Sequence, residues 1–167
     1  MLEKRWTPHV TVAAIVEHEG RFLLVEEETA DGLRLNNPAG HLDPGESPVE
    51  GVVREVLEET TRRFCAEALV GVYLARHRRP QEHHDVSYLR LAFCGSVADA
   101  DPLLSLDTGI VRTLWLSADE IRASVDRHRS PLLVAGIDDY LAGRRFPLDM
   151  LRTDASVLLR GLAVAAD

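Results

Sequence analysis

The chain has 167 residues and a formal net charge of −8, which suits one domain with one core and excludes a general binder of nucleic-acid polymers. No apolar run approaches the ~20 residues of a membrane span, and the first ten residues lack the apolar region of a secretory signal. Two cysteines, Cys65 and Cys94, are too few for a disulfide framework. We expect a cytoplasmic protein that does not bind membranes, with a single domain over residues 1–167 and a tail, 151–167, whose packing stays open.

The expected elements form a strand-rich order with one early helix. Runs of β-branched and apolar residues predict strands at 9–16, 21–27, 33–37, 68–75, 86–94 and 110–116. Helices are predicted at 47–63, 117–125 and 131–141. Residues 18–20 are suited to a hairpin turn between the first two strands. This order favours an α/β sandwich with a mixed sheet over a regular parallel array.

The early helix begins with a clear start signal and carries a cluster of carboxylates. Ser47 can cap the helix, and Glu50 completes a Ser-x-x-Glu capping box. At about 100° per residue, Glu55, Glu58 and Glu59 share an arc of about 100°. We expect the apolar side chains of the segment on the opposite face: Val49, Val52, Val53, Val56, Leu57 and Phe64.

Two interpretations of this cluster are open from the helix alone. The simpler interpretation is a solvated acidic face, although exposed like charges at this spacing repel one another. The other is a hard-cation site, because Mg²⁺ takes carboxylate oxygens together with the phosphate of a substrate. The residues on either side favour the cation site.

Gly40 is followed after five residues by Glu46, and after seven more by Arg-Glu-Val-Leu-Glu-Glu at 54–59. This pattern resembles the box of the Nudix hydrolases, which cleave a diphosphate linked to another moiety with Mg²⁺ or Mn²⁺. The resemblance implies an enzyme with the Nudix fold, an α/β/α sandwich with a mixed β-sheet. It also implies that Arg54 pairs with a box glutamate and that Glu46 helps to hold that arrangement.

The resemblance also implies a set of metal ligands. Glu58 and Glu59 would hold the metal, with the carbonyl of Gly40 joining them. Glu55 would be a further ligand or the base that deprotonates the attacking water. Nudix enzymes often bring another acidic residue to the metal, and Asp107 is the candidate here, although a turn-forming Asp is equally natural at that position.

The pattern departs from the usual box at the end of the helix. A glycine and an aliphatic residue normally follow, and here they are Thr61 and Arg62. A β-branched residue resists a left-handed conformation at a cost of about 1–2 kcal/mol. We therefore predict that Thr61 is not left-handed and that the helix runs on to about Arg63. Arg62 would then lie between the glutamates.

Outside the box, most of residues 8–150 resembles a bacterial subgroup of the family, the NudJ-like phosphatases, most specifically at 130–132 and 145–148. The resemblance implies release of orthophosphate from nucleoside tri- and diphosphates, from thiamine pyrophosphate and from hydroxymethylpyrimidine pyrophosphate. Two alternatives remain: a sugar-nucleotide or dinucleoside polyphosphate pyrophosphatase, and a non-catalytic Nudix domain that binds a nucleotide. Monomer and homodimer are both open.

Two further positions are candidates for substrate contact. Arg90 lies in an apolar strand on the same face as Tyr88 and Ala92, and its inward-facing cation needs either a substrate phosphate or a structural acid. Asn37 flanks the start of the box, where Asn-Pro is also a turn signal. Residues 76–85, basic and then His-His-Asp, are expected to form a solvent-exposed loop.

Overall fold

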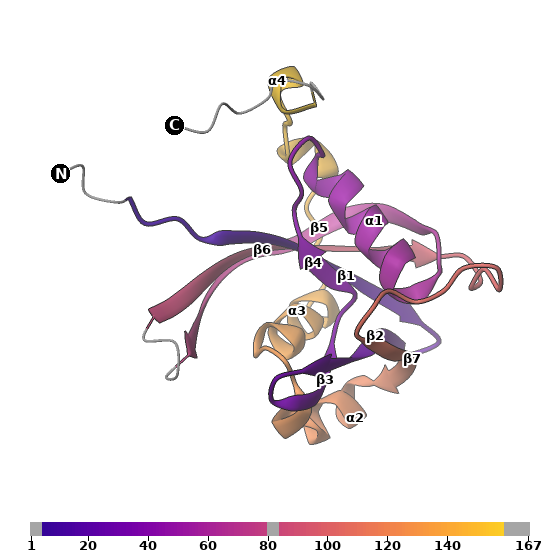
Figure 1. The fold of residues 1–167 in the computed structure, drawn as a ribbon. Coiled ribbons are helices and arrows are strands. Elements are labelled where there is room, and N and C mark those ends of the chain that lie inside the picture. Colours follow the sequence, from indigo (N-terminus) through magenta and orange to yellow (C-terminus); the bar gives the residue numbers. More distant parts are fainter. Residues whose placement is uncertain (1–4, 80–83, 159–167) are drawn as a thin grey trace.

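The computed structural model describes residues 5–79 and 84–158, in which a mixed sheet is covered on both faces (Figure 1). Its strands are β1 (His9–His18), β2 (Arg21–Thr29), β3 (Gly32–Asn36), β4 (Ala39–His41), β5 (Phe64–Arg79), β6 (His84–Val97) and β7 (Ile110–Ser117). Its helices are α1 (Pro48–Thr60), α2 (Ala118–Ala123), α3 (Leu132–Leu141) and α4 (Ala155–Leu158), with 3-10 turns at Val125–Arg127 and Leu148–Met150.

The strand order explains why the sheet is mixed. The strands follow the path β3-β2-β1-β6-β5, while β4 pairs with β1 and β7 pairs with β2. The β1–β6 pair is parallel, and the other pairs are antiparallel. A two-residue turn joins β1 to β2, with φ of 50° at Glu19 and 77° at Gly20, as a type I′ hairpin requires. The predicted hairpin and mixed sheet are confirmed.

Two hydrophobic cores lie on opposite faces of the sheet. On one face, Val52 and Val56 of α1 pack with Val12 of β1. On the other face, Leu133 and Ile137 of α3 pack with Ile121 of α2 and with the strand residues whose side chains point to that face. The middle of β1 is buried on both sides, as expected for a central strand between two helical layers. The predicted α/β/α sandwich is confirmed.

Strands β5 and β6 are longer than the sequence suggested and project beyond the rest of the fold (Figure 1). The prediction of a loop over 76–85 is wrong for most of that segment. Arg76 pairs with Ser87 and His77 with Val86 in the antiparallel ladder, and an Arg76–Asp85 ion pair links the two strands. Cross-strand hydrogen bonds and this ion pair stabilise the segment as a strand, although its residues are polar. Residues 80–83, which include His83 of the His-His-Asp run, lie outside the described residues.

The end of α1 contradicts the prediction for Thr61. The helix ends at Thr60, and Thr61 is left-handed with φ 56° and ψ 20°. Its N–H donates to the carbonyl of Leu57 (2.9 Å), and its own carbonyl accepts the N–H of Asp101 (2.8 Å). The buried Phe64 already begins β5, so the chain must turn within three residues. Burial and hydrogen bonding therefore outweigh the cost of a left-handed threonine.

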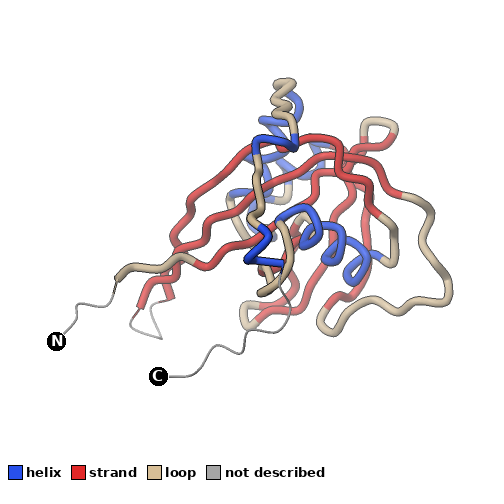
Figure 2. Tube along the Cα trace, turned by 90° about the horizontal axis from the view of Figure 1, so that it is seen from above, coloured by secondary structure: helices blue, strands red, loops and turns tan. Residues whose placement is uncertain are grey.

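The turn also takes Arg62 away from the glutamates. Its Nη1 donates to the carbonyl of Ala98 (3.0 Å), and its guanidinium carbon lies 5.9 Å from the centroid of the Trp115 ring. Ala98 begins the long connection from β6 to β7, which is drawn as a tan loop in Figure 2. The predicted placement of Arg62 between the carboxylates is wrong, because it assumed a helix that continues past Thr60.

The C-terminal part described here ends with the short helix α4, while 159–167 of the tail lie outside the described residues. Along the described chain, no helix is both long and apolar enough to cross a membrane. Cys65 is exposed, Cys94 is buried, and both are free thiols.

Candidate active site

Strand β4, which the sequence did not predict, brings the box glycine against the glutamate helix. It pairs with β1 so that Gly40 lies opposite Val12 and Ala39 opposite Ala13. A Cβ atom added to Gly40 would lie 2.2 Å from the carboxyl carbon of Glu55. Only a residue without a side chain lets this carboxylate approach the backbone so closely. The glycine of the motif is thus explained by a contact with Glu55, the first carboxylate of the cluster on the helix.

The glutamates of α1 divide into two buried and one exposed. Glu55 and Glu59 are each 9% exposed, whereas Glu58 is open to solvent. Glu59 Oε2 accepts the N–H of Ala39 (2.8 Å), so two carboxylates converge on the backbone of β4.

The expectation that the carboxylates face away from the apolar stripe is wrong for Glu55 and Glu59. Both side chains are buried, as are those of Val52 and Val56 in the same turns of the helix. The physical reason is that β4 covers the carboxylates while the central sheet covers the valines, so two neighbouring sides of α1 are buried. The predicted capping box at Ser47 and Glu50 is present.

Arg54 holds the box together through hydrogen bonds to three of its glutamates. Its Nε and Nη2 bind the two oxygens of Glu46 (3.0 and 2.8 Å), a bidentate pair. Its Nη1 donates to Glu55 Oε1 (2.7 Å) and to Glu58 Oε2 (3.0 Å). Its Nη2 also donates to the carbonyl of His41 (2.9 Å), which ties α1 to β4. Arg54 therefore orients the carboxylates and anchors the strand they approach.

The electrostatics of the buried carboxylates favour a cation. Burial, together with the nearby charges of Glu55, Glu27 and Asp107, raises the pKa of Glu59 to about 8. Burial also raises the pKa of Glu55, although Arg54 acts against this. In contrast, the hydrogen bonds from Arg54 lower the pKa of Glu46. Within the part of the chain that the structure describes, Glu59 forms no ion pair, and a positive ion beside it would supply the missing charge.

The oxygen atoms at this site fit a hard divalent cation. Arg54 uses one oxygen of Glu55 and one of Glu58, and the Ala39 N–H uses one of Glu59, which leaves Glu55 Oε2, Glu58 Oε1 and Glu59 Oε1. Carboxylate oxygens are the ligands that Mg²⁺ and Mn²⁺ prefer. Among the described residues, no three acidic, histidine or cysteine side chains are yet gathered around one point.

Asp107 lies at the C-terminal end of α1. Its backbone N–H donates to the carbonyl of Glu58 (2.9 Å), and its Oδ1 accepts the N–H of Thr108 (2.7 Å). The side chain is exposed and forms the local turn that its sequence also suggested. Its charge nevertheless acts on Glu59, so it is close enough to contribute to the potential of the site.

A cleft of about 610 Å³ opens beside β4 and leads away from the box. Ala39 and Gly40 of β4 line it, as do Arg90 of β6 and its partner in the sheet register, Thr11 of β1. The Nε and Nη1 atoms of Arg90 are buried and have no hydrogen-bond partner among the described residues. Burial lowers the pKa of Arg90 to about 10, against the attraction of Glu27 and Glu59.

Glu27 and Arg129, which sequence reasoning missed, line the cleft together with Asn36, which flanks the start of the box and was a candidate for substrate contact. Glu27 Oε1 accepts the amide of Asn36 (3.2 Å), and Glu27 Oε2 pairs with Arg129 (3.1 Å). Burial raises the pKa of Glu27. No spacing in the sequence links these positions, since β2, β3 and the segment before α3 meet only in the folded chain. Asn37, the predicted contact, is buried and does not line the cleft; Asn36 does.

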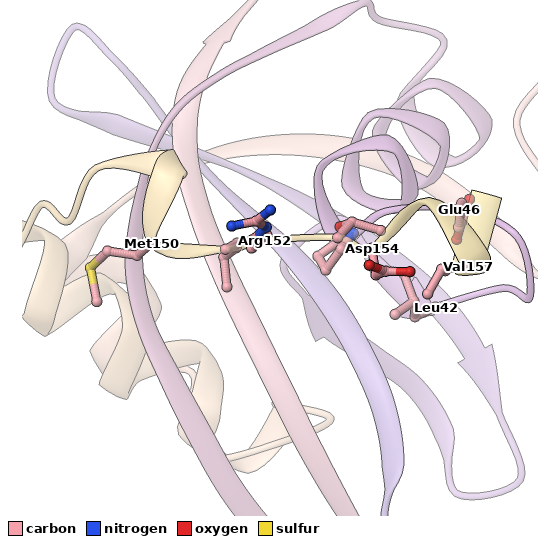
Figure 3. A pocket seen from close by; sticks show the side chains of 9 residues that line it. Leu42, Glu46, Met150, Arg152, Asp154 and Val157 are labelled. Carbon is pink, nitrogen blue, oxygen red and sulfur yellow. The ribbon is translucent and has the colours of Figure 1, made fainter.

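A second cavity of about 530 Å³ lies on the outer side of the box loop (Figure 3). Leu42 and Glu46 line it together with the C-terminal segment from Met150 to Val157. The carboxylates of Glu55, Glu58 and Glu59 line neither cavity, but Ala39 and Gly40, whose backbone Glu59 and Glu55 approach, line the first cleft and not the second. The first cleft, which includes the backbone beside Glu55 and Glu59, is therefore the candidate active site.

Comparison with known proteins agrees with this geometry. The NUDIX domain model matches residues 7–134. The phosphatase NudJ of Escherichia coli K12 is 37% identical over 147 residues, which cover 86% of this chain and 90% of that protein. A NUDIX hydrolase from Nitrosomonas europaea is 48% identical, with a TM-score of 0.81 over 89% of this chain and 98% of its own.

A UDP-X diphosphatase structure, with a TM-score of 0.66 and 19% identity over 87% of this chain and 68% of its own, shares the fold. The family match covers the box, β4 and the Arg90 strand together. The chain belongs to the Nudix family and is a Nudix hydrolase.

Proposed function

We propose that this hydrolase uses Mg²⁺ or Mn²⁺ to cleave phosphoanhydride bonds and release orthophosphate. Its proposed substrates are nucleoside tri- and diphosphates, with thiamine pyrophosphate and hydroxymethylpyrimidine pyrophosphate as further members of the set. The observation that carries the proposal is the convergence of the buried Glu55 and Glu59 on the backbone of residues 39 and 40. The similarity to a phosphatase supports release of orthophosphate.

The carboxylates and Arg54 have separate roles in this proposal. Glu58 and Glu59, joined by the carbonyl of Gly40 and by Asp107, would hold the cation. When bound, the cation supplies charge neutralisation at the phosphate and activation of water. Arg54 keeps the carboxylates in place through its hydrogen bonds.

Glu55 has two possible roles, as a ligand or as the base that takes the proton of the attacking water. Its raised pKa and its contact with Gly40 fit both. A Glu55→Gln variant separates them. Loss of a base lowers kcat and removes the acidic limb of the pH–rate profile, whereas loss of a ligand also raises the metal concentration needed for half-maximal rate.

On the substrate side, we propose that Arg90 binds a phosphate oxygen. Its two buried nitrogens without partners face the cleft that begins at the box. A guanidinium in that state costs desolvation energy that a bound phosphate would offset. The proposal includes Asn37 as a second contact, although its side chain is buried and does not line the cleft.

The test is a panel of ADP, ATP, thiamine pyrophosphate, ADP-ribose and a dinucleoside polyphosphate, each with Mg²⁺ and with excess EDTA. We expect orthophosphate from the first three with Mg²⁺ and no turnover with EDTA. Pyrophosphate plus a monophosphate from ATP would contradict the proposed bond cleavage. Preferred cleavage of ADP-ribose or the dinucleoside would favour the pyrophosphatase alternative.

A pair of variants tests the role of the box. Glu58→Gln removes one exposed carboxylate without disturbing the core and is expected to lower kcat by at least about 100-fold. Glu67→Gln, an exposed glutamate of β5 outside the site, is the matched control. Intact turnover in Glu58→Gln would contradict the mechanism, while tight nucleotide binding without hydrolysis in the wild type would favour a non-catalytic domain.

A further inference from the structure

We propose that the cleft contains a subsite for an aromatic ring, formed by Tyr88 and His41 with His9 behind them. The ligand class is a heteroaromatic group carried on a diphosphate, such as a nucleoside diphosphate. This inference rests on the proposed hydrolysis and adds to it the part of the substrate that does not react.

The ring cluster is built by the sheet register. His9 of β1 lies opposite Tyr88 of β6, and Thr11 of β1 lies opposite both Arg90 and His41 of β4. Three rings from three strands therefore meet on one face. Their centroids are 5.4 Å apart for His9–His41, 5.6 Å for His9–Tyr88 and 6.2 Å for His41–Tyr88. His9 Nδ1 and His41 Nε2 lie 3.2 Å apart and connect the two imidazoles by a hydrogen bond.

The geometry of the cluster leaves ring surface for a ligand. The three pairs are tilted or edge-to-face, with interplanar angles of 47° to 64°, so none of these rings is sandwiched against another. His41 is exposed and Tyr88 half-buried, and both line the cleft. A planar heteroaromatic group could stack on either ring.

The position of Arg90 fixes the order of groups along the cleft. Arg90 is two residues after Tyr88 on the same face of β6, and its charge acts on Glu59 of the box. Along β1, Gly40 lies opposite Val12, Arg90 opposite Thr11 and Tyr88 opposite His9. The lining therefore passes from the backbone beside the carboxylates to Arg90, whose Nε and Nη1 have no hydrogen-bond partner among the described residues, and then to Tyr88. A diphosphate held between the carboxylates and Arg90 would carry its organic group toward Tyr88.

The cleft is large enough for this ligand. Its volume of about 610 Å³ lies within the ordinary range of small-molecule sites, roughly 300–1,000 Å³. A bare pyrophosphate would leave most of it empty. Tyr88 and His41 supply ring surface to this lining, alongside the cations Arg76 and Arg129.

The experiment compares ADP with methyl diphosphate, which has no ring, in the wild type, Tyr88→Leu and Tyr88→Phe. We expect the ratio of kcat/KM for ADP to that for methyl diphosphate to fall about tenfold in Tyr88→Leu, mainly through KM. In Tyr88→Phe the ratio should stay within about twofold of the wild type, because the ring is retained. An equal ratio in all three proteins would overturn the subsite.

A binding measurement separates this inference from the proposed hydrolysis. ADP is titrated calorimetrically into each protein in excess EDTA, and thermal melting checks that each variant is folded. Weaker binding of ADP to Tyr88→Leu than to Tyr88→Phe supports the subsite, whether or not any of the proteins hydrolyses ADP. If none of them hydrolyses ADP, only the hydrolysis proposal is contradicted. ADP that binds the wild type no more tightly than methyl diphosphate would overturn the subsite while leaving hydrolysis intact.

Discussion

Two buried glutamates, one on a strand and one on a helix, show how the surroundings of a carboxylate decide its role. Glu26 of β2 is 3% exposed and accepts hydrogen bonds from Arg112 (2.7 Å) and Arg127 (2.5 Å). These partners, Arg112 first, lower its pKa. Glu59 of α1 is 9% exposed and accepts one backbone N–H, and burial raises its pKa to about 8.

The difference separates a structural ion pair from a site that needs a ligand. The two arginines of Glu26 come from β7 and from the turn before α3, so the charge network ties three elements together. Glu59 has acidic neighbours instead, and the nearest arginine of the box, Arg54, binds Glu46, Glu55 and Glu58. Burying a carboxylate in this way costs stability unless a cation arrives.

The largest effect is expected from Glu59→Gln. The amide still accepts the Ala39 N–H but removes the charge that a cation needs, so kcat/KM should fall by at least about 100-fold. The melting temperature of the metal-free protein at pH 8 should not fall, since the variant has no buried charge. Steady-state assays and thermal melts measure both. Unchanged turnover would show that Glu59 is not a ligand.

Glu26→Gln should have the reverse effect. It breaks two charge-assisted hydrogen bonds at a buried position, so the free energy of unfolding should fall by about 1–3 kcal/mol. The kcat of the folded enzyme should change little, because Glu26 does not line the cleft. Urea denaturation and an active-site-normalised assay test this. A large loss of kcat with unchanged stability would reverse the comparison.

The two glutamates should also differ in pH dependence in excess EDTA. Glu59 has a raised folded pKa, so its contribution to stability is fully present below about 4.5 and is lost as pH rises through about 8. The stability of Glu59→Gln relative to the wild type should therefore grow between pH 5 and 8, by at most about 1.4 kcal/mol per pH unit.

Glu26 has a lowered folded pKa, so its contribution is present above about 4.5 and is lost as pH falls below that value. Urea midpoints from pH 4 to 8.5 for the wild type and both variants measure the two trends. If the stability difference between the wild type and Glu59→Gln did not change with pH, the buried Glu59 would have to be compensated by a partner.

The smallest effect is expected at the end of α1. Thr61→Gly removes the strain of a left-handed threonine but also a buried side chain, so stability should rise by about 0.5–1 kcal/mol. Activity should stay within about twofold, because no box carboxylate is moved. Thr60→Gly, one residue earlier and helical, is the control and should be destabilising. A loss of stability in Thr61→Gly would show that packing of the threonine outweighs the strain.

Local patterns in the sequence were enough to locate several elements and the chemistry of the box. The capping box at Ser47 and the hairpin at residues 18–20 depend on neighbours a few residues apart, and both were found where they were predicted. The strand and helix periods also depend on such neighbours, and they located the predicted strands and helices, although the ends of several differ. The spacing of Gly40, Glu46 and the α1 glutamates indicated the family for the same reason. Such features are set by backbone preferences and by helical geometry, which act over short distances.

The features that were missed or wrongly predicted depend on contacts far apart in the chain. The left-handed Thr61 follows from the need to place Phe64 in the core and to bond residues 98–101. The burial of Glu55 and Glu59 follows from β4, a three-residue strand that exists because β1 pairs with it. The meeting of Glu27, Asn36 and Arg129 across the cleft is of the same kind.

The sequence by itself determined which residues are acidic, where α1 begins and which family the chain resembles. Only the tertiary structure decided which carboxylates are buried, how each is compensated and what faces them across the cleft. The physical reason is that burial and electrostatic potential are sums over neighbours from every strand and helix, and no local pattern contains those sums.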